Sequence, residues 1–128
     1  MAQILLIEPD KILAGNIRDY FAKANHKVIT HNDLQKAVQS ADGNLPAVVI
    51  MELQLAGRSG IEFLYEFRSY PDWQSVPVVI YTSYKTEDLL AYGGVFKDLN
   101  TSKVLYKPEA GLGALLSAAE EQLVPATI

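Results

Sequence analysis

The sequence predicts an α/β fold, a doubly wound parallel sheet of five strands with helices on both faces. Short apolar runs without a polar break alternate along the chain with segments in which apolar residues recur at helical spacing. This alternation is typical of parallel sheets whose strands are connected by helices. The chain has 128 residues, the length of one ordinary domain. We therefore expect a single domain over residues 1–128.

The first third of the chain predicts two strand–helix units. A first apolar run stops before Pro9, which cannot extend a central strand. A helical pattern begins directly after Asp10, a typical N-cap residue. A short β-prone run then leads to a second helical pattern, which ends at the turn sequence Asp42-Gly43-Asn44. We expect strands at residues 3–7 and 27–30 and helices at residues 11–24 and 33–41.

The remaining residues predict three further units. An apolar run ends at Glu52, and Ser59 with Glu62 has the spacing of a capping box at the start of a helix. The next apolar run leads to Thr82, and a weaker helical pattern follows until Gly93-Gly94 interrupts it. A last short run leads to a final amphipathic segment. We expect strands at residues 47–51, 76–81 and 102–106 and helices at residues 60–70, 86–92 and 112–123.

Composition excludes several other classes of protein. Apolar residues make up 49% and charged residues 20% of the chain, which argues against disorder and against a coiled coil. No apolar run approaches the roughly 20 residues of a membrane helix, and no signal sequence is recognisable, so we expect a cytoplasmic protein without a membrane partner. The net charge is -4 and the basic residues are scattered, so we expect no direct binding to nucleic acid.

Four of the five expected strands are followed by a residue with a charged or hydroxyl side chain. Glu8 follows the first strand, Glu52 the third, Thr82 the fourth and Lys107 the fifth. In an open parallel sheet, ligands bind outside the carboxyl ends of the strands, where the strand order reverses. We therefore expect two carboxylates, a hydroxyl and an ammonium group to converge on one crevice. The alternative for Glu8, Glu52 and Lys107 is a solvated side chain at the end of a strand, and the alternative for Thr82 is a hydroxyl that shapes a turn or the entry to a helix.

Together these segments resemble the receiver domain of bacterial two-component response regulators. Residues 4–10 are similar to the family's first strand and acidic pair, and residues 49–60 to its phospho-acceptor strand and the following loop. Residues 77–83 are similar to the strand that ends in the switch Thr or Ser, and residues 104–108 to the strand with the Lys-Pro pair. The resemblance implies a flavodoxin-like fold with strand order 2-1-3-4-5 and a role in phosphorelay signal transduction.

The chain departs from the family at the acceptor. The family has an aspartate there, which takes a phosphoryl group from a histidine kinase and binds Mg²⁺ with the acidic pair, but this chain has Glu52. The extra methylene moves the carboxylate outward by about 1.5 Å, and phosphoryl transfer depends on close positioning. The second position of the acidic pair is Pro9, and Asp10 is expected to cap a helix rather than bind a metal. We expect no resident cofactor and at most weak Mg²⁺ binding.

The resemblance leads to two functional hypotheses. The first is a pseudo-receiver, a signalling module that is not an enzyme and acts by contact with a histidine kinase, an output domain or a second copy of itself. In this hypothesis Glu52 either holds one, active-like conformation as a partial mimic of the phosphorylated state or fills a silent site. Its partner surface is expected on the fourth helix, fifth strand and fifth helix. The second is a receiver that is still phosphorylated in the presence of Mg²⁺, on Glu52 or by another route. A flavodoxin-like cofactor binder lacks support, because no loop reads G-x-G-x-x-G. The expected site consists of Glu8, Asp10, Glu52, Thr82 and Lys107.

Overall fold

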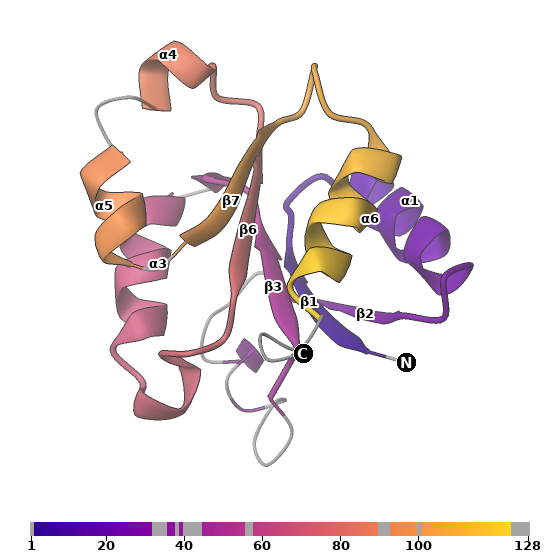
Figure 1. Ribbon diagram of the computed structural model, residues 1–128, viewed down its shortest axis with the longest axis horizontal. Coiled ribbons are helices and arrows are strands. Elements are labelled where there is room, and N and C mark those ends of the chain that lie inside the picture. The colour runs from indigo at the N-terminus through magenta and orange to yellow at the C-terminus, as the bar shows by residue number, and fades with distance from the viewer. Residues whose placement is uncertain are drawn as a thin grey trace.

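A parallel sheet lies at the centre of the protein (Figure 1). The computed structural model describes residues 2–31, 36, 37, 39, 45–55, 58–89, 93–99 and 101–123. Within these residues, five strands pair in the order β2-β1-β3-β6-β7, and every neighbouring pair is parallel. The strands are β1 (Gln3–Ile7), β2 (Lys27–Thr30), β3 (Val48–Met51), β6 (Val78–Thr82) and β7 (Thr101–Tyr106). Counted along the chain, this is the predicted order 2-1-3-4-5.

Helices cover both faces of the sheet, as the sequence predicted. On one face lie α1 (Lys11–Ala22) and α6 (Leu112–Glu121) (Figure 1). On the other lie α3 (Gly60–Arg68) and α5 (Gly93–Asp98), with the short α4 (Thr86–Leu89) beyond the ends of the strands. None of the described helices has both the length and the apolar character needed to cross a membrane.

The sheet separates two hydrophobic cores, and successive residues of a strand contribute to opposite ones. The core on the α1 and α6 side takes Ile4, Leu6, Val48, Ile50, Val79 and Tyr81 from the strands. The core on the α3 side takes Leu5, Ile7, Val49, Met51, Val78 and Ile80. Because both faces are buried, the central strands have apolar runs instead of alternating polar and apolar residues.

The helix starts agree with the sequence where they are described. Asp10 caps α1, since its Oδ1 accepts hydrogen bonds from the N–H groups of Ile12 at 3.0 Å and Leu13 at 3.1 Å. Ser59 caps α3 by accepting from the N–H of Ile61 at 3.1 Å. Lys36, Ala37 and Gln39 are helical, but the rest of the helix predicted at residues 33–41 and the turn at residues 42–44 lie outside the described residues.

The prediction that Gly93-Gly94 interrupts the fourth helix was wrong, because these glycines begin α5. Glycine costs less in the first turn of a helix, whose N–H groups have no partner within the helix in any case. Phe96, only 8% exposed, packs into the core on the α3 side, and such burial outweighs a weak local propensity.

Besides α5, a pair of short strands and a 3₁₀ turn were not predicted. The strands β4 (Gln54–Leu55) and β5 (Arg58–Ser59) form a small antiparallel pair directly after Glu52. A 3₁₀ turn, η1 (Pro71–Trp73), follows α3 where the sequence indicated only a break. The first of these elements shapes the loop beside the site.

Candidate functional site: a buried carboxylate network at the strand ends

Glu52 lies directly after β3, and its side chain is only 3% exposed. Its backbone N–H donates to the carbonyl of Ile7 at 3.0 Å, which continues the pairing of β3 with β1 beyond the last strand residue. The residue is therefore positioned by the centre of the sheet. A carboxylate this deeply buried requires partners for its charge.

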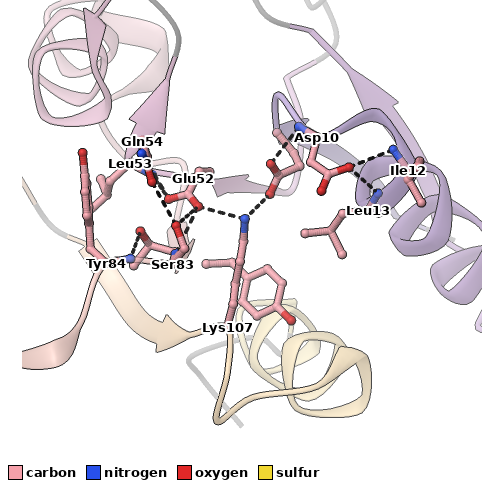
Figure 2. A network of polar contacts seen from close by, with 12 residues as sticks. Asp10, Ile12, Leu13, Glu52, Leu53, Gln54, Ser83, Tyr84 and Lys107 are labelled. Carbon is pink, nitrogen blue, oxygen red and sulfur yellow. Dashed lines mark hydrogen bonds and ion pairs between the residues drawn. The ribbon is translucent and has the colours of Figure 1, made fainter.

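Lys107 supplies the positive charge. Its Nζ donates to Oε1 of Glu52 at 2.8 Å and to Oε1 of Glu8 at 2.7 Å, so one ammonium group bridges two buried carboxylates. Figure 2 shows the Lys107 side chain reaching up to the Glu52 carboxylate. The backbone N–H of Lys107 donates to the carbonyl of Thr82 at 2.8 Å, which continues the pairing of β7 with β6. The structure thus brings together the residues after β1, β3 and β7.

The Glu52 side chain folds back onto backbone N–H groups. Its Oε2 accepts from the N–H groups of Leu53 at 2.6 Å and Gln54 at 3.1 Å. Its Oε1 also accepts from Ser83, from the N–H at 3.1 Å and the hydroxyl at 3.3 Å. We call these donors, together with Lys107 Nζ, the anion nest. Converging N–H groups with a nearby cation form a typical anion-binding concavity, and here the protein's own carboxylate fills it (Figure 2).

The network keeps its groups charged. Burial raises the pKa of Glu52, but hydrogen bonds from Lys107, Thr82, Gln54 and Ser83 outweigh this and lower it below its ordinary value. Burial likewise lowers the pKa of Lys107, but the two carboxylates outweigh this and raise it. Both shifts favour the ionised pair.

Thr82 is fully buried at the end of β6, and its hydroxyl has two roles. Its Oγ1 accepts from the N–H of Tyr84 at 3.1 Å, a local bond of the kind that the sequence left open as an alternative. The hydroxyl also contributes to the lowered pKa of Glu52. Thr82 therefore lies within the site and also shapes the turn that leads to α4.

Asp10 has a different role from the two buried acids, Glu8 and Glu52. It is exposed, and its Oδ1 is occupied by the two N–H groups at the start of α1. Only its backbone joins the network, through an N–H that donates to Oε2 of Glu8 at 3.1 Å. Its carboxylate acts as the helix cap.

The arrangement does not fit the Mg²⁺ ion that the family resemblance implies. Lys107 Nζ bonds one oxygen of each buried carboxylate, and backbone N–H groups bond the other oxygens. Pro9 offers no side-chain ligand. The described part of the chain contains no group of three His, Asp or Glu residues arranged to hold a metal ion. Because Mg²⁺ requires near-octahedral oxygen ligands, binding would first require this network to be dismantled.

Sequence reasoning missed part of the site. Ser83 was treated only as the end of a strand, although it contributes two donors to Glu52. The N–H groups of Leu53 and Gln54 have no signature in the sequence, because every residue other than proline has such a donor. Their position depends on Gly60, where a Cβ would lie 2.5 Å from Cα of Leu53. The available signal was Gly60 itself, directly after Ser59, because a glycine can mark a close approach of two backbones.

Comparisons with known proteins agree with the fold. Residues 4–119 match the family model described as the response regulator receiver domain. The chain is 29% identical to the regulatory protein VanRB of Enterococcus faecalis over 86 residues, which cover 67% of this chain and 38% of that protein. It is 25% identical to the KDP operon transcriptional regulatory protein KdpE of Escherichia coli, over 68% of this chain and 37% of that protein. The chain therefore spans well under half the length of these two relatives.

Solved structures share the fold at lower identity. A sensor protein from Polaromonas sp. JS666 superposes with a TM-score of 0.83 at 17% identity, covering 95% of both chains. The chemotaxis protein CheY4 of Vibrio cholerae superposes with a TM-score of 0.79 at 19% identity, covering 94% of this chain and 98% of that one. These likenesses support the architecture.

Proposed function

Because the chain belongs to the response regulator receiver family, we propose that it is a two-component signalling module that acts by protein contact, without phosphorylation at residue 52 and not as an enzyme. One observation carries the proposal: the Glu52 carboxylate occupies the anion nest. It bonds the N–H groups of its own loop and of Ser83, and it pairs with Lys107.

Occupation of the nest removes what a phosphoryl transfer would use. Transfer onto a carboxylate is accelerated by donors and cations that stabilise the charge on the phosphoryl oxygens. Here a cation and N–H groups in this position already bond the carboxylate of Glu52 itself. The nest holds a permanent negative charge supplied by the chain, which makes Glu52 a built-in substitute for an added anion.

The hydrogen bonds of Glu52 hold the nearby loops in one conformation, on the side of the molecule where we expect a partner to bind. Glu52 ties Ser83 to the loop after β3, and Ser83 leads into the segment before α4. By family resemblance the partner surface comprises α4, β7 and α6. Val104 in β7 is 37% exposed, Tyr84 in the segment before α4 is 39% exposed, and β7 is an edge strand. An edge strand offers backbone groups as well as side chains to a partner.

The partner in this proposal is a histidine kinase or an output domain or protein, in the cytoplasm, with a homodimer as the alternative. Receiver domains interact with kinases and with output domains, and VanRB and KdpE extend well beyond the region that this chain matches. We also propose that residues 1–128 act as one receiver unit.

The retained Lys107 and Thr82 favour a second candidate, a receiver that is still phosphorylated. In it, Glu52 or another residue accepts a phosphoryl group after the carboxylate has left the nest. The two candidates differ in one measurable property, the formation of a covalent adduct.

Intact mass spectrometry after incubation with a small acyl phosphate donor and Mg²⁺ tests the proposal. We expect no stoichiometric phosphoryl adduct on the wild-type chain, because the donors that would stabilise transfer bond Glu52. A receiver domain with an aspartate acceptor, treated in parallel, serves as the positive control. A stoichiometric adduct that forms on the wild type and is lost in Glu52→Ala would establish the second candidate instead.

A further inference from the structure

A second polar hollow, of about 510 Å³, lies between residues 11–18 of α1, the end of β2 and Lys36. Figure 1 shows α1 next to β2, at the β2 edge of the sheet. Among the described residues, three cationic side chains line the hollow, those of Lys11, Arg18 and Lys36, together with His31 and Glu8. Its volume falls within the range of roughly 300–1,000 Å³ that is common for small-molecule sites.

The three cations have no acidic partner within the described part of the chain. The ion pairs there involve His26, Lys103 and Lys107. Glu8 lines the hollow, but its Oε1 bonds Lys107 at 2.7 Å instead. Cations that converge on one hollow repel one another, and a bound anion relieves this repulsion. The cluster is notable in a chain whose formal net charge is -4.

The sequence of α1 keeps the hollow open. Lys11, Gly15 and Arg18 are four and three residues apart, so they share one face of the helix. A Cβ at Gly15 would meet only Nη2 of Arg18, at 3.9 Å, so packing does not require a glycine. Glycine inside a helix costs about 0.5–1 kcal/mol relative to alanine. The absence of a side chain at residue 15 instead leaves space between the two cations.

We propose that this hollow binds a small molecule through one phosphate or diphosphate group. Arg18 offers a planar pair of donors that matches phosphate oxygens, and the two lysines add point charges around it. The cations converge on a concave site rather than forming an extended stripe, which favours a compact ligand over a nucleic acid or a membrane surface. Glu8 belongs both to the hollow and to the Glu52 network, because its Oε1 accepts from Nζ of Lys107.

Titration of the ¹⁵N-labelled chain with inorganic pyrophosphate, at constant ionic strength, tests the proposal. We expect saturable chemical-shift changes in residues 11–18 and 30–31, and a weaker response to inorganic phosphate. Arg18→Gln and Lys11→Gln are each expected to weaken binding by about tenfold. The matched control is Lys23→Gln, which removes the same charge at the exposed C-terminal end of the same helix and should leave binding unchanged. A parallel titration with ADP establishes whether the hollow also accepts a nucleoside.

A second variant tests whether binding needs the space in the hollow as well as its positive charge. Gly15→Leu keeps every cation but fills the space between Lys11 and Arg18, and we expect it to abolish pyrophosphate binding while circular dichroism stays unchanged. The proposal is overturned if wild-type shifts do not saturate, if Lys23→Gln weakens binding as much as Arg18→Gln, or if Gly15→Leu binds like the wild type. Saturable binding of an acidic peptide but not of pyrophosphate would reassign the surface to a protein partner and also overturn it.

Discussion

At residue 52, one methylene group decides what the carboxylate contacts. The longer side chain allows the oxygens of Glu52 to turn back to the N–H groups of Leu53 and Gln54 and still reach Lys107. Oε1 accepts from Lys107 and Ser83, and Oε2 accepts from the N–H groups of Leu53 and Gln54. Such a buried charge is stable only while all of these partners stay in place.

The lowered pKa of Glu52 predicts a specific loss of stability in acid. The group binds protons more weakly in the folded chain than in the unfolded chain, whose ordinary value is 4.5. Its contribution to stability is therefore complete above that value and is lost as the pH falls through the lower folded pKa. We expect the free energy of unfolding, measured with urea, to fall less steeply below pH 4.5 in Glu52→Gln than in the wild type.

The control for this experiment is Asp98→Asn, which neutralises an exposed carboxylate at the end of α5. It should leave the acid slope close to that of the wild type. An acid slope in Glu52→Gln equal to that of the wild type would show that Glu52 is not held as an ion in the folded state.

Among the elements, the start of α3 lies very close to the residues after β3. This contact is possible because Gly60 has no side chain. A Cβ on Gly60 would lie 2.5 Å from Cα and 2.9 Å from O of Leu53, and backbone atoms at this distance have to move. The N–H of Gly60 also donates to that oxygen at 2.7 Å. This contact sets the path of the loop whose N–H groups bond Glu52.

Gly60→Ala is expected to destabilise the protein by about 1–3 kcal/mol, although alanine is the better helix former. Urea unfolding measures the change. Gly94→Ala is the matched control, because a Cβ there meets nothing within 4 Å, and it should be neutral or stabilising by up to about 1 kcal/mol. If Gly60→Ala were as stable as Gly94→Ala, the close approach at Leu53 would not constrain the loop.

Arg68 joins the end of α3 to two connections of the fold. Its Nη1 donates to the carbonyls of Trp73 at 2.7 Å, Gln74 at 3.2 Å and Val76 at 2.7 Å, and its Nε donates to that of Leu99 at 2.8 Å. Arg68→Met leaves these carbonyls without their donors, and we expect a loss of about 2–4 kcal/mol in urea unfolding. Arg68→Lys should recover only part of it, since an ammonium lacks the planar fork. Full recovery by lysine would mean that charge alone is needed.

Sequence patterns predicted elements where the local and tertiary preferences agree. The central strands were predictable because burial on both faces requires continuous apolar residues, as at Val48–Met51. The helix at Gly93–Asp98 was not, because burial of Phe96 overrides two glycines. In the site, Glu8 and Lys107 were predictable as strand-end residues. The anion nest was not, since it consists mostly of backbone donors whose positions depend on the path of a loop.

Across the whole molecule, the network ties together segments that are distant in sequence. Lys107 joins the residues after β1 and β3, and Ser83 joins those after β3 and β6. The two cores hold the strands, whereas this network holds the loops at one end of them. A change in the charge of Glu52 should therefore alter these loops without loosening either core.

Amide hydrogen exchange measures whether the loops change while the two cores do not. In Glu52→Gln we expect faster amide exchange at Leu53, Gln54 and Ser83, because a neutral amide is a weaker acceptor than a carboxylate. Exchange at Phe63 in α3 and at Ile50 in β3 should stay as in the wild type, since both side chains are fully buried in the cores. Unchanged exchange at all five positions would argue that Glu52 fills a silent site and does not hold the loops.

The anion in the nest is covalently attached to the chain, and this has a consequence for signalling. A tethered group faces its donors at a high effective concentration that free anions in the cell do not match. If Glu52 sets the active-like state, that state is present from the moment the chain folds and does not decay by hydrolysis. The signal would then be carried by how much of the protein the cell makes and how fast it is degraded. Its timescale would be that of synthesis and proteolysis rather than that of a kinase.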